Sequence, residues 1–81
     1  MKIAFSKRAI DDYDSLSGKL KLKADKQFSL LLKNFRHPSI KTKKYNEALD
    51  IWQGRIDRSY RFYFKFEGGV VFIVAITKHP K

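Results

Sequence analysis

The sequence has no cysteine, one methionine and only two prolines. Without cysteine there are no disulfide bonds and no thiolate chemistry, which fits a reducing compartment. Long apolar runs are also missing, because the longest uncharged apolar stretch, residues 70–76, is far too short to span a membrane. Residues 1–8 lack the apolar segment of a signal peptide. We therefore expect a cytoplasmic protein with no membrane partner.

Acidic residues are scarce. The chain has 8 Asp and Glu against 18 Lys and Arg, which gives a net charge of +10 and a pI near 10.0. Such an excess favours polyanions, above all nucleic acid or a ribonucleoprotein, because Lys and Arg displace counterions from phosphates. A solvated surface or an acidic protein partner is the alternative.

The residues that are present can build a core. Hydrophobic residues make up 43% and aromatic residues 15% of the 81 positions, which excludes a disordered basic tail. At this length we expect one domain, residues 1–81. The sequence shows no repeat and no linker.

The apolar pattern predicts an α+β fold with the order β-α-α-β-β-β. Ser6 is a plausible N-cap for a first helix, and Ser17-Gly18 separates that helix from a second one. Residues 40–48 are polar and are expected to be irregular. The expected elements are a strand at 2–5, helices at 7–16 and 19–35, and strands at 51–56, 60–66 and 70–77. We expect the helical hairpin to pack on one face of a mainly antiparallel four-stranded sheet.

The lengths of two loops determine which side chains share a face of this sheet. A three-residue loop at 57–59 places Trp52 and Ile56 in the core and Gln53, Arg55 and Arg61 together on the open face. The next connection allows two registers: a two-residue turn at 68–69 or a three-residue loop at 67–69.

We favour the three-residue loop at 67–69, because it gathers the largest side chains on one face. In that register Phe62 pairs with Val74, Phe64 with Phe72, and Phe66 with Val70. The opposite face then carries Ala75, Thr77 and His79 beside the arginines.

The predicted open face holds groups suited to RNA cleavage through the 2′-hydroxyl. That reaction needs a base, cations that stabilise the phosphorane, and an acid for the departing 5′-oxygen. Arg55 and Arg61 supply permanent charge and a planar fork for phosphate oxygens. His79 changes charge near neutral pH and is suited to acid or base work. A salt bridge with Asp57 or Asp50 is the structural alternative for Arg55.

Further basic and aromatic residues are candidates for RNA contact. Tyr63, on the open face, is a candidate for stacking on a base. The other candidates are basic: Lys41, Lys43, Lys44 and Lys78. We expect no metal and no cofactor, because two distant histidines, no cysteine and no acidic cluster form no ligand set.

Residues 52–62, WQGRIDRSYRF, resemble the W-x-x-R-[IV]-x-x-x-[YH]-R pattern of the RelE/ParE toxin superfamily. Residues 37–40, HPSI, are similar to its H-P-S-[LI] loop, and the ending at Thr77-Lys78-His79 resembles its histidine-bearing, YoeB-type ribonucleases. The resemblance implies the toxin of a type II toxin–antitoxin pair, with a cognate antitoxin as partner. RelE-type members cut mRNA on the ribosome without a metal, whereas ParE-type members inhibit DNA gyrase.

The resemblance also implies roles for the matched residues. Arg61 would contact the phosphate or the transition state, Arg55 would contact RNA or brace the sheet, and His79 would act as general acid or base. Lys43 and Lys44 stand where the YoeB type has a glutamate, and no aromatic residue follows His79. The sequence thus predicts a ribosome-dependent endoribonuclease. A gyrase inhibitor or an inactive antitoxin-bound module is the alternative.

Overall fold

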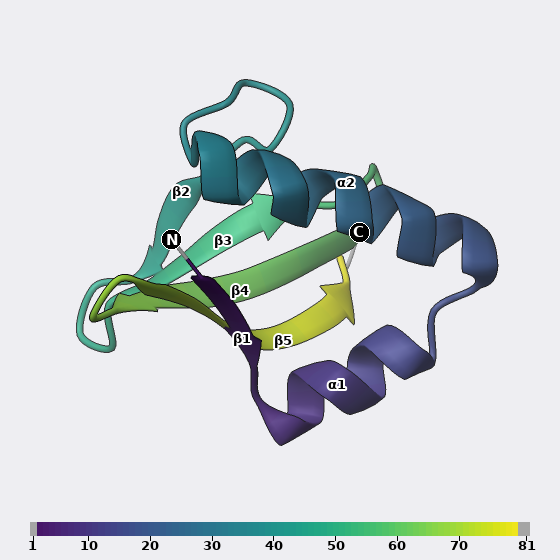
Figure 1. Cartoon of the computed structure of the whole chain (residues 1–81), viewed down its shortest axis with the longest axis horizontal. Helices are drawn as coiled ribbons and strands as arrows, with labels where there is room; N and C mark the ends of the chain where they lie inside the picture. Colours follow the sequence, from purple (N-terminus) through teal and green to yellow (C-terminus); the bar gives the residue numbers. More distant parts are fainter. Residues whose placement is uncertain (1, 80–81) are drawn as a thin grey trace.

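The structure, a computed structural model, describes residues 2–79. Five strands form one sheet in the order β1-β5-β4-β3-β2, in which β1 runs parallel to β5 and the other neighbours are antiparallel. Two helices lie next to this sheet (Figure 1). The elements are β1 (Lys2–Phe5), α1 (Lys7–Asp14), α2 (Gly18–Lys33), β2 (Lys43–Asn46), β3 (Ile51–Arg55), β4 (Tyr60–Glu67) and β5 (Val70–Lys78). The expected α+β class is confirmed.

The expected number of four strands was wrong, because the segment expected to be irregular contains β2. Lys43 pairs with Gln53 and Lys44 with Trp52, and the register shifts before Asn46. All four residues of β2 are polar or amphipathic, and the strand forms an edge of the sheet. Its sequence therefore lacks the apolar alternation that reveals a half-buried strand.

Serine side chains cap both helices. Ser6 Oγ accepts the Ala9 N–H at 3.0 Å, and Ser17 Oγ accepts the Leu20 N–H at 3.2 Å. Ser6 is therefore the N-cap of α1, as expected, and Ser17 is the N-cap of α2 as well as separating it from α1. α2 ends at Lys33, two residues earlier than predicted.

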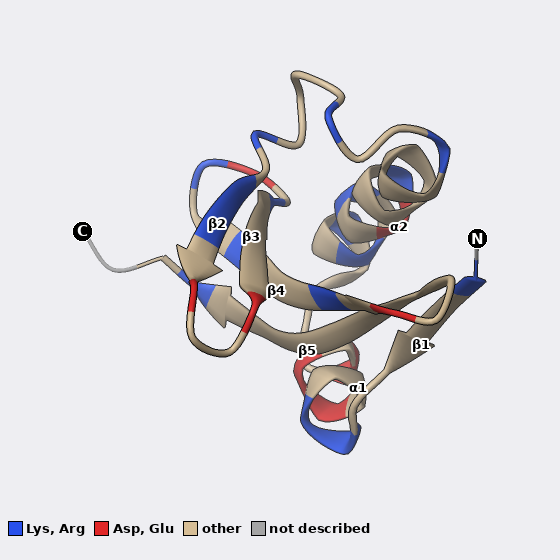
Figure 2. Ribbon diagram, turned by 90° about the vertical axis from the view of Figure 1, so that its left-hand side faces the viewer, with Lys and Arg blue, Asp and Glu red and all other residues tan. Residues whose placement is uncertain are grey.

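The two helices occupy different places on the sheet. α2 lies over one face, whereas α1 lies along the edge of β5 beyond the end of β1 (Figures 1 and 2). The Ser6 hydroxyl donates to the Val74 carbonyl at 2.6 Å, and the Asp12 carboxylate accepts the Ile76 N–H at 2.9 Å. Side chains of the α1 region thus satisfy backbone groups that a further strand would otherwise pair.

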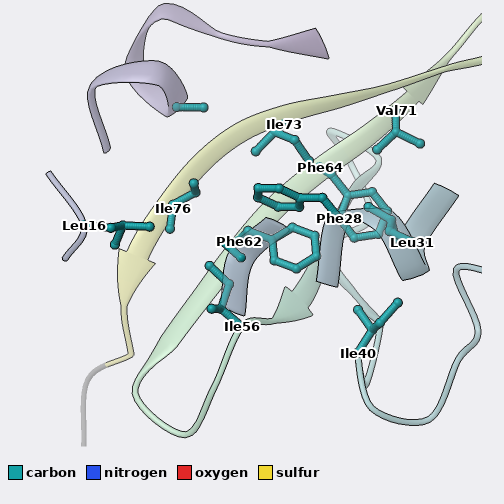
Figure 3. Packing of buried hydrophobic residues seen from close by; sticks show 12 residues of the cluster. Leu16, Phe28, Leu31, Ile40, Ile56, Phe62, Phe64, Val71, Ile73 and Ile76 are labelled. Carbon is teal, nitrogen blue, oxygen red and sulfur yellow. The ribbon is translucent and has the colours of Figure 1, made fainter. Parts of the chain in front are cut away.

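The core lies between α2 and the sheet (Figure 3). Phe62 and Phe64 of β4 are fully buried, and Phe28 of α2 packs edge-on against Phe62 with 5.0 Å between ring centroids. Ala24 and Leu31 of α2 are buried with Phe28 and form the apolar stripe of this helix. The aromatic face of the central strand therefore meets this helix.

The favoured register between the last two strands was wrong. Phe66 pairs with Val71, because the connection is a two-residue turn in which Gly68 and Gly69 have φ of +51° and +78°. Such positive φ values suit a type I′ hairpin turn. Beyond the turn, a shift between Tyr63 and Phe64 changes the pairing by one residue.

This bulge restores the predicted open face at the far end of the hairpin. Phe62 pairs with Ile76, so both side chains lie in the core, while Arg61 pairs with Thr77. A bulge of this kind leaves one residue unpaired and re-aims the side chains beyond it.

Within residues 2–79, no helix is long and apolar enough to cross a membrane.

Candidate nucleic-acid interface

A hollow of about 260 Å³ opens on the sheet face away from α2. Its lining residues come from β3, β4 and the segment before and within β2: Lys41, Lys43, Gln53, Arg55 and Arg61. Arg55 and Arg61 are direct partners across the two antiparallel strands. Like charges placed opposite each other repel, so the fold must hold this pair by other contacts.

One backbone carbonyl supplies the main contacts. The Asp57 carbonyl oxygen accepts from Arg61 Nη1 at 2.7 Å and from Arg55 Nε at 3.2 Å. Arg61 Nη1 is also 3.1 Å from the Tyr60 carbonyl. Among residues 2–79, neither guanidinium forms an ion pair with a carboxylate. The two arginines are therefore oriented while their positive charge remains available to an anion.

The loop that carries this carbonyl is fixed by the side chain of Asp57. Its Oδ1 accepts the N–H groups of Ser59 at 2.8 Å and Tyr60 at 2.9 Å, the arrangement of an Asx turn. Its Oδ2 lies 3.8 Å from Lys23 Nζ. In place of the salt bridge considered for Arg55, the contact with Asp57 runs through the main chain.

The backbone of Arg55 is also held by hydrogen bonds. Its N–H donates to the Ile40 carbonyl at 2.8 Å, and its carbonyl accepts from Gln27 Nε2 at 2.8 Å. The same Gln27 nitrogen donates to the Ser39 carbonyl at 3.0 Å. Gln27 is 6% exposed, so this amide links α2, the loop before β2 and β3 inside the protein.

No family model matches the sequence, and no curated protein matches it. Solved structures do match. A YoeB/ParE toxin from Agrobacterium tumefaciens is 16% identical, with 99% of this chain and 100% of that chain covered and a TM-score of 0.82. The YoeB of Staphylococcus aureus, solved as a dimer, is 20% identical, covers 99% and 98%, and has a TM-score of 0.82. The isolated RelE toxin of E. coli is 19% identical, covers 99% and 85%, and has a TM-score of 0.77. The fold is that of the RelE/ParE toxins.

The resemblance drawn from the sequence is thus confirmed in the fold. In this RelE-like fold the motif at 52–62 forms β3, the loop at 57–59 and the start of β4. The predicted three-residue loop is correct, because Arg55 pairs with Arg61 and Ile56 N–H donates to the Tyr60 carbonyl. The HPSI segment supplies Ile40, which is fully buried and whose carbonyl accepts the Arg55 N–H.

The three lysines near β2 occupy different places in the RelE-like fold. Lys41 and Lys43 line the hollow, and Lys43 is opposite Gln53. Lys44 lies opposite Trp52 on the other face, with Nζ 4.6 Å from that ring and 2.7 Å from Asp50 Oδ1. The hydrogen bond with Asp50 raises the pKa of Lys44, which keeps this amine charged.

His79 directly follows β5 and contacts the loop at 57–59 through its backbone. Its backbone N–H donates to the Ser59 carbonyl, which continues the β4–β5 ladder past the pair of Arg61 with Thr77. Alternation continued one residue past β5 would place His79 on the same face as Thr77, but His79 is not among the residues that line the hollow. Lys78 is opposite Tyr60 and belongs to the other face. Pro80 and Lys81, where the family often has an aromatic residue, lie outside the described residues.

Aromatic side chains extend the hollow across the open face. The Tyr63 hydroxyl accepts from Gln53 Nε2 at 3.2 Å, and the Tyr63 ring lies 4.7 Å from that of Tyr45. Tyr63 is half-buried, whereas Tyr45 is 60% exposed. Tyr45 was missed in the sequence because its segment was expected to be irregular. Of the two, it presents the more accessible ring.

The chemical groups of this face are cations, an amide and phenols. Within residues 2–79, no three His, Asp or Glu side chains gather into a group that can hold a metal ion. Gln27 was also missed in the sequence. One feature of the sequence could have indicated its burial, because it is a polar residue beside the apolar stripe of Ala24, Phe28 and Leu31. A buried amide in that position needs hydrogen-bond partners from neighbouring segments.

Proposed function

We propose that this chain is the toxin of a type II toxin–antitoxin pair and a metal-independent endoribonuclease that cleaves mRNA on the ribosome. One observation carries the proposal: Arg55 and Arg61 lie side by side, oriented by one carbonyl and without a carboxylate partner among the described residues. The RelE-like fold supports it, because the solved proteins that share this fold are toxins.

The proposed reaction uses the RNA as its own nucleophile. The 2′-oxygen attacks the adjacent phosphorus while the bond to the 5′-oxygen breaks, which leaves a 2′,3′-cyclic phosphate and a 5′-hydroxyl. Arg61 and Arg55 bind the non-bridging oxygens and stabilise the charge that develops there. Lys41 and Lys43 bind phosphates at the rim. The 2′-hydroxyl loses its proton and the departing 5′-oxygen gains one, and His79 carries out one of these two transfers.

The alternatives make less use of this geometry. A ParE-type inhibitor of DNA gyrase acts without cleaving RNA, and an inactive antitoxin-bound module needs no oriented arginines. Both leave unexplained why two like charges are paired across neighbouring strands, an arrangement that costs stability. An anion that binds between them accounts for the arrangement.

Cleavage in a translating extract tests this function. We expect the purified protein to cut a reporter mRNA only while it is translated and to leave 5′-hydroxyl ends, mapped by primer extension. His79→Ala should slow cleavage about 10²- to 10⁴-fold, the usual contribution of general acid–base catalysis. Circular dichroism would establish that this variant is folded.

Two further measurements separate the alternatives. Intact mRNA together with blocked supercoiling by purified gyrase would replace the nuclease with the gyrase inhibitor. Intact mRNA, normal supercoiling and harmless expression in bacteria would support the inactive module. Unchanged cleavage by His79→Ala would remove His79 from the reaction while leaving the nuclease assignment in place.

The proposed antitoxin should carry an acidic segment that covers the arginine hollow. Solved relatives of this fold include the YoeB-YefM complex of Staphylococcus aureus and the E. coli RelBE complex. The net charge of +10 favours such a partner. Pull-down of the product of the neighbouring gene should succeed at low salt and weaken at high salt. No binding at either salt concentration would contradict this part of the proposal.

A further inference from the structure

A second hollow, of about 340 Å³, lies beside α2 on the other side of Arg55. Its charged lining residues are Lys23 and Lys26 of α2, Arg55 at the end of β3, and Asp57 and Arg58 of the following loop. Four cations therefore face one carboxylate. Figure 2 shows mainly basic charged residues on α2, whereas α1 carries both basic and acidic ones.

The carboxylate does not neutralise this hollow. Asp57 Oδ1 accepts two backbone N–H groups, and Oδ2 is 3.8 Å from Lys23 Nζ, a long contact. Lys26 and Arg58 are exposed and form no ion pair with another residue in 2–79. The hollow thus keeps a net positive charge.

Arg55 lines both hollows, so their cations adjoin at the end of β3, and we call this set of residues the cationic track. The floor of the track is rigid. Gln27 joins the Arg55 and Ser39 carbonyls, and Asp57 closes the loop that carries Arg58. Groups fixed before binding lose less entropy when an anion binds between them.

We propose that the second hollow binds backbone phosphates of single-stranded RNA next to the phosphate held by Arg55 and Arg61. The strand would then cross from the open sheet face onto α2. This inference rests on the proposed function, since it takes the first hollow as the site of the scissile phosphate. The contacts are with phosphate oxygens, so the second hollow adds affinity without reading the base sequence.

RNA suits this surface better than a protein segment does. A helical partner inserts apolar side chains into a groove, and this hollow offers no exposed apolar anchor among its lining residues. Ile56, its apolar lining residue, is only 5% exposed. A surface of Lys and Arg above a polar floor is typical of backbone binding.

A charge-matched pair of variants tests the inference. The triple variant Lys23→Gln, Lys26→Gln, Arg58→Gln removes three cations from the second hollow. The control, Lys7→Gln, Lys19→Gln, Lys33→Gln, removes three exposed helix lysines that line neither hollow. Both variants have the same net charge, so general electrostatic attraction falls equally.

The probe is a fluorescent, 2′-O-methylated RNA of about ten nucleotides, which cannot react through its 2′-oxygen and can span both hollows. Anisotropy titrations at several salt concentrations give its affinity and salt slope. We expect the hollow variant to bind about tenfold more weakly than the control, with the slope lower by about 0.7 for each lost phosphate contact. A dinucleotide probe, confined to the first hollow, should bind both variants equally.

Equal binding of the longer probe by both variants would overturn the inference while leaving the first hollow untouched. Loss of poly-glutamate binding by the hollow variant, with RNA binding unchanged, would also overturn it and assign the surface to an acidic protein segment. Absence of RNA binding by the unmodified protein, with mRNA intact in the translating extract, would overturn the proposed function together with the inference.

Discussion

The two ends of β3 carry cations that the fold treats differently. At the end of the strand, Arg55 and the facing Arg61 contact backbone carbonyls. At its start, Lys44 on the neighbouring β2 contacts the Asp50 carboxylate at 2.7 Å and lies over the Trp52 ring. A carbonyl orients a guanidinium and leaves its net charge, whereas a carboxylate cancels the charge. The first arrangement suits a phosphate site and the second suits a structural contact.

This comparison shows that a cluster of charged residues in the sequence does not by itself predict a binding surface. Lys43 and Lys44 are neighbours in the chain, yet strand alternation sends them to opposite faces of the sheet. Lys43 joins the arginine hollow and Lys44 joins an ion pair. Substitutions at the two ends of β3 should therefore have unequal effects.

The largest difference is expected between Arg61→Ala and Lys44→Ala. In the proposed reaction Arg61 stabilises the developing charge, so its loss should lower the rate of mRNA cleavage about 10²- to 10³-fold. Lys44→Ala should leave the rate near that of the unmodified protein. Primer extension in the translating extract, with each variant checked by circular dichroism, measures both.

Arg61→Lys sharpens this prediction. It keeps the charge and loses the planar fork that binds two phosphate oxygens at once, so its rate should lie between those of Arg61→Ala and the unmodified protein. Equal rates for the Arg61→Ala and Lys44→Ala variants would mean that the two ends of β3 do not differ in function.

The pairing of Arg55 with Arg61 followed from the sequence, because counting three loop residues and applying strand alternation fixes which side chains share a face. The bulge between Tyr63 and Phe64 did not follow. The extra residue is Val74 of β5, whose carbonyl accepts the Ser6 hydroxyl, and nothing local in the apolar run at 70–77 marks it. The favoured register was wrong because the turn has two residues, and the sequence did not show that the extra residue Val74 restores the core pairing beyond it.

The contacts that position the hollow could not be predicted from the sequence either. Gln27 and Asp12 are polar helix residues whose partners are main-chain groups 28 and 64 positions away along the chain. Periodicity predicts which face of a helix is apolar, but it does not say which distant carbonyl or N–H a polar side chain will meet. Such contacts appear only once the elements are assembled.

Gly54→Ala should disrupt the arginine end of β3 through the fold itself. A Cβ at Gly54 would lie 2.3 Å from Cζ of the Phe62 ring, which is fully buried and packs against Phe28 and Phe64. Overpacking of this kind should lower the free energy of unfolding by about 2–3 kcal/mol, measured by urea denaturation. It would also separate the strands that hold Arg55 against Arg61.

Gly18→Ala is the matched control. Gly18 begins α2, has nothing within 4 Å of an added Cβ and is not among the residues with positive φ. Alanine there should raise the free energy of unfolding by about 0.4–1 kcal/mol, because it reduces the entropy of the unfolded chain. A loss of stability in both variants would show that the close approach of Phe62 is not the cause.

Asp57→Ala tests whether the carbonyl contacts orient the arginines. It removes the acceptor for the N–H groups of Ser59 and Tyr60, which should cost about 1–2 kcal/mol of stability and loosen the loop that aims the Asp57 carbonyl. We expect cleavage to slow about tenfold, as for a misplaced catalytic group. Asp57→Asn keeps the Oδ1 acceptor and should restore most of the rate, whereas equal rates in the two variants would contradict a positioning role.

The smallest effects are expected at two residues with positive φ, one near each end of β3. Lys41, on the arginine hollow, has φ of +51°, and Asp50, beside Lys44, has φ of +55°. Lysine is poorly suited to this conformation, whereas Asn and Asp adopt it more readily. Lys41→Asn should therefore raise the free energy of unfolding by about 0.5–1 kcal/mol while weakening RNA binding.

Asp50→Asn relieves no such strain and removes the carboxylate partner of Lys44. It should therefore leave the free energy of unfolding unchanged or slightly lower, and it should leave RNA binding unaltered. Urea denaturation and anisotropy titration of both variants measure the contrast. A gain in stability at Asp50 as large as that at Lys41 would mean that strain is not concentrated at the hollow, and that a lysine is held there for reasons other than its charge.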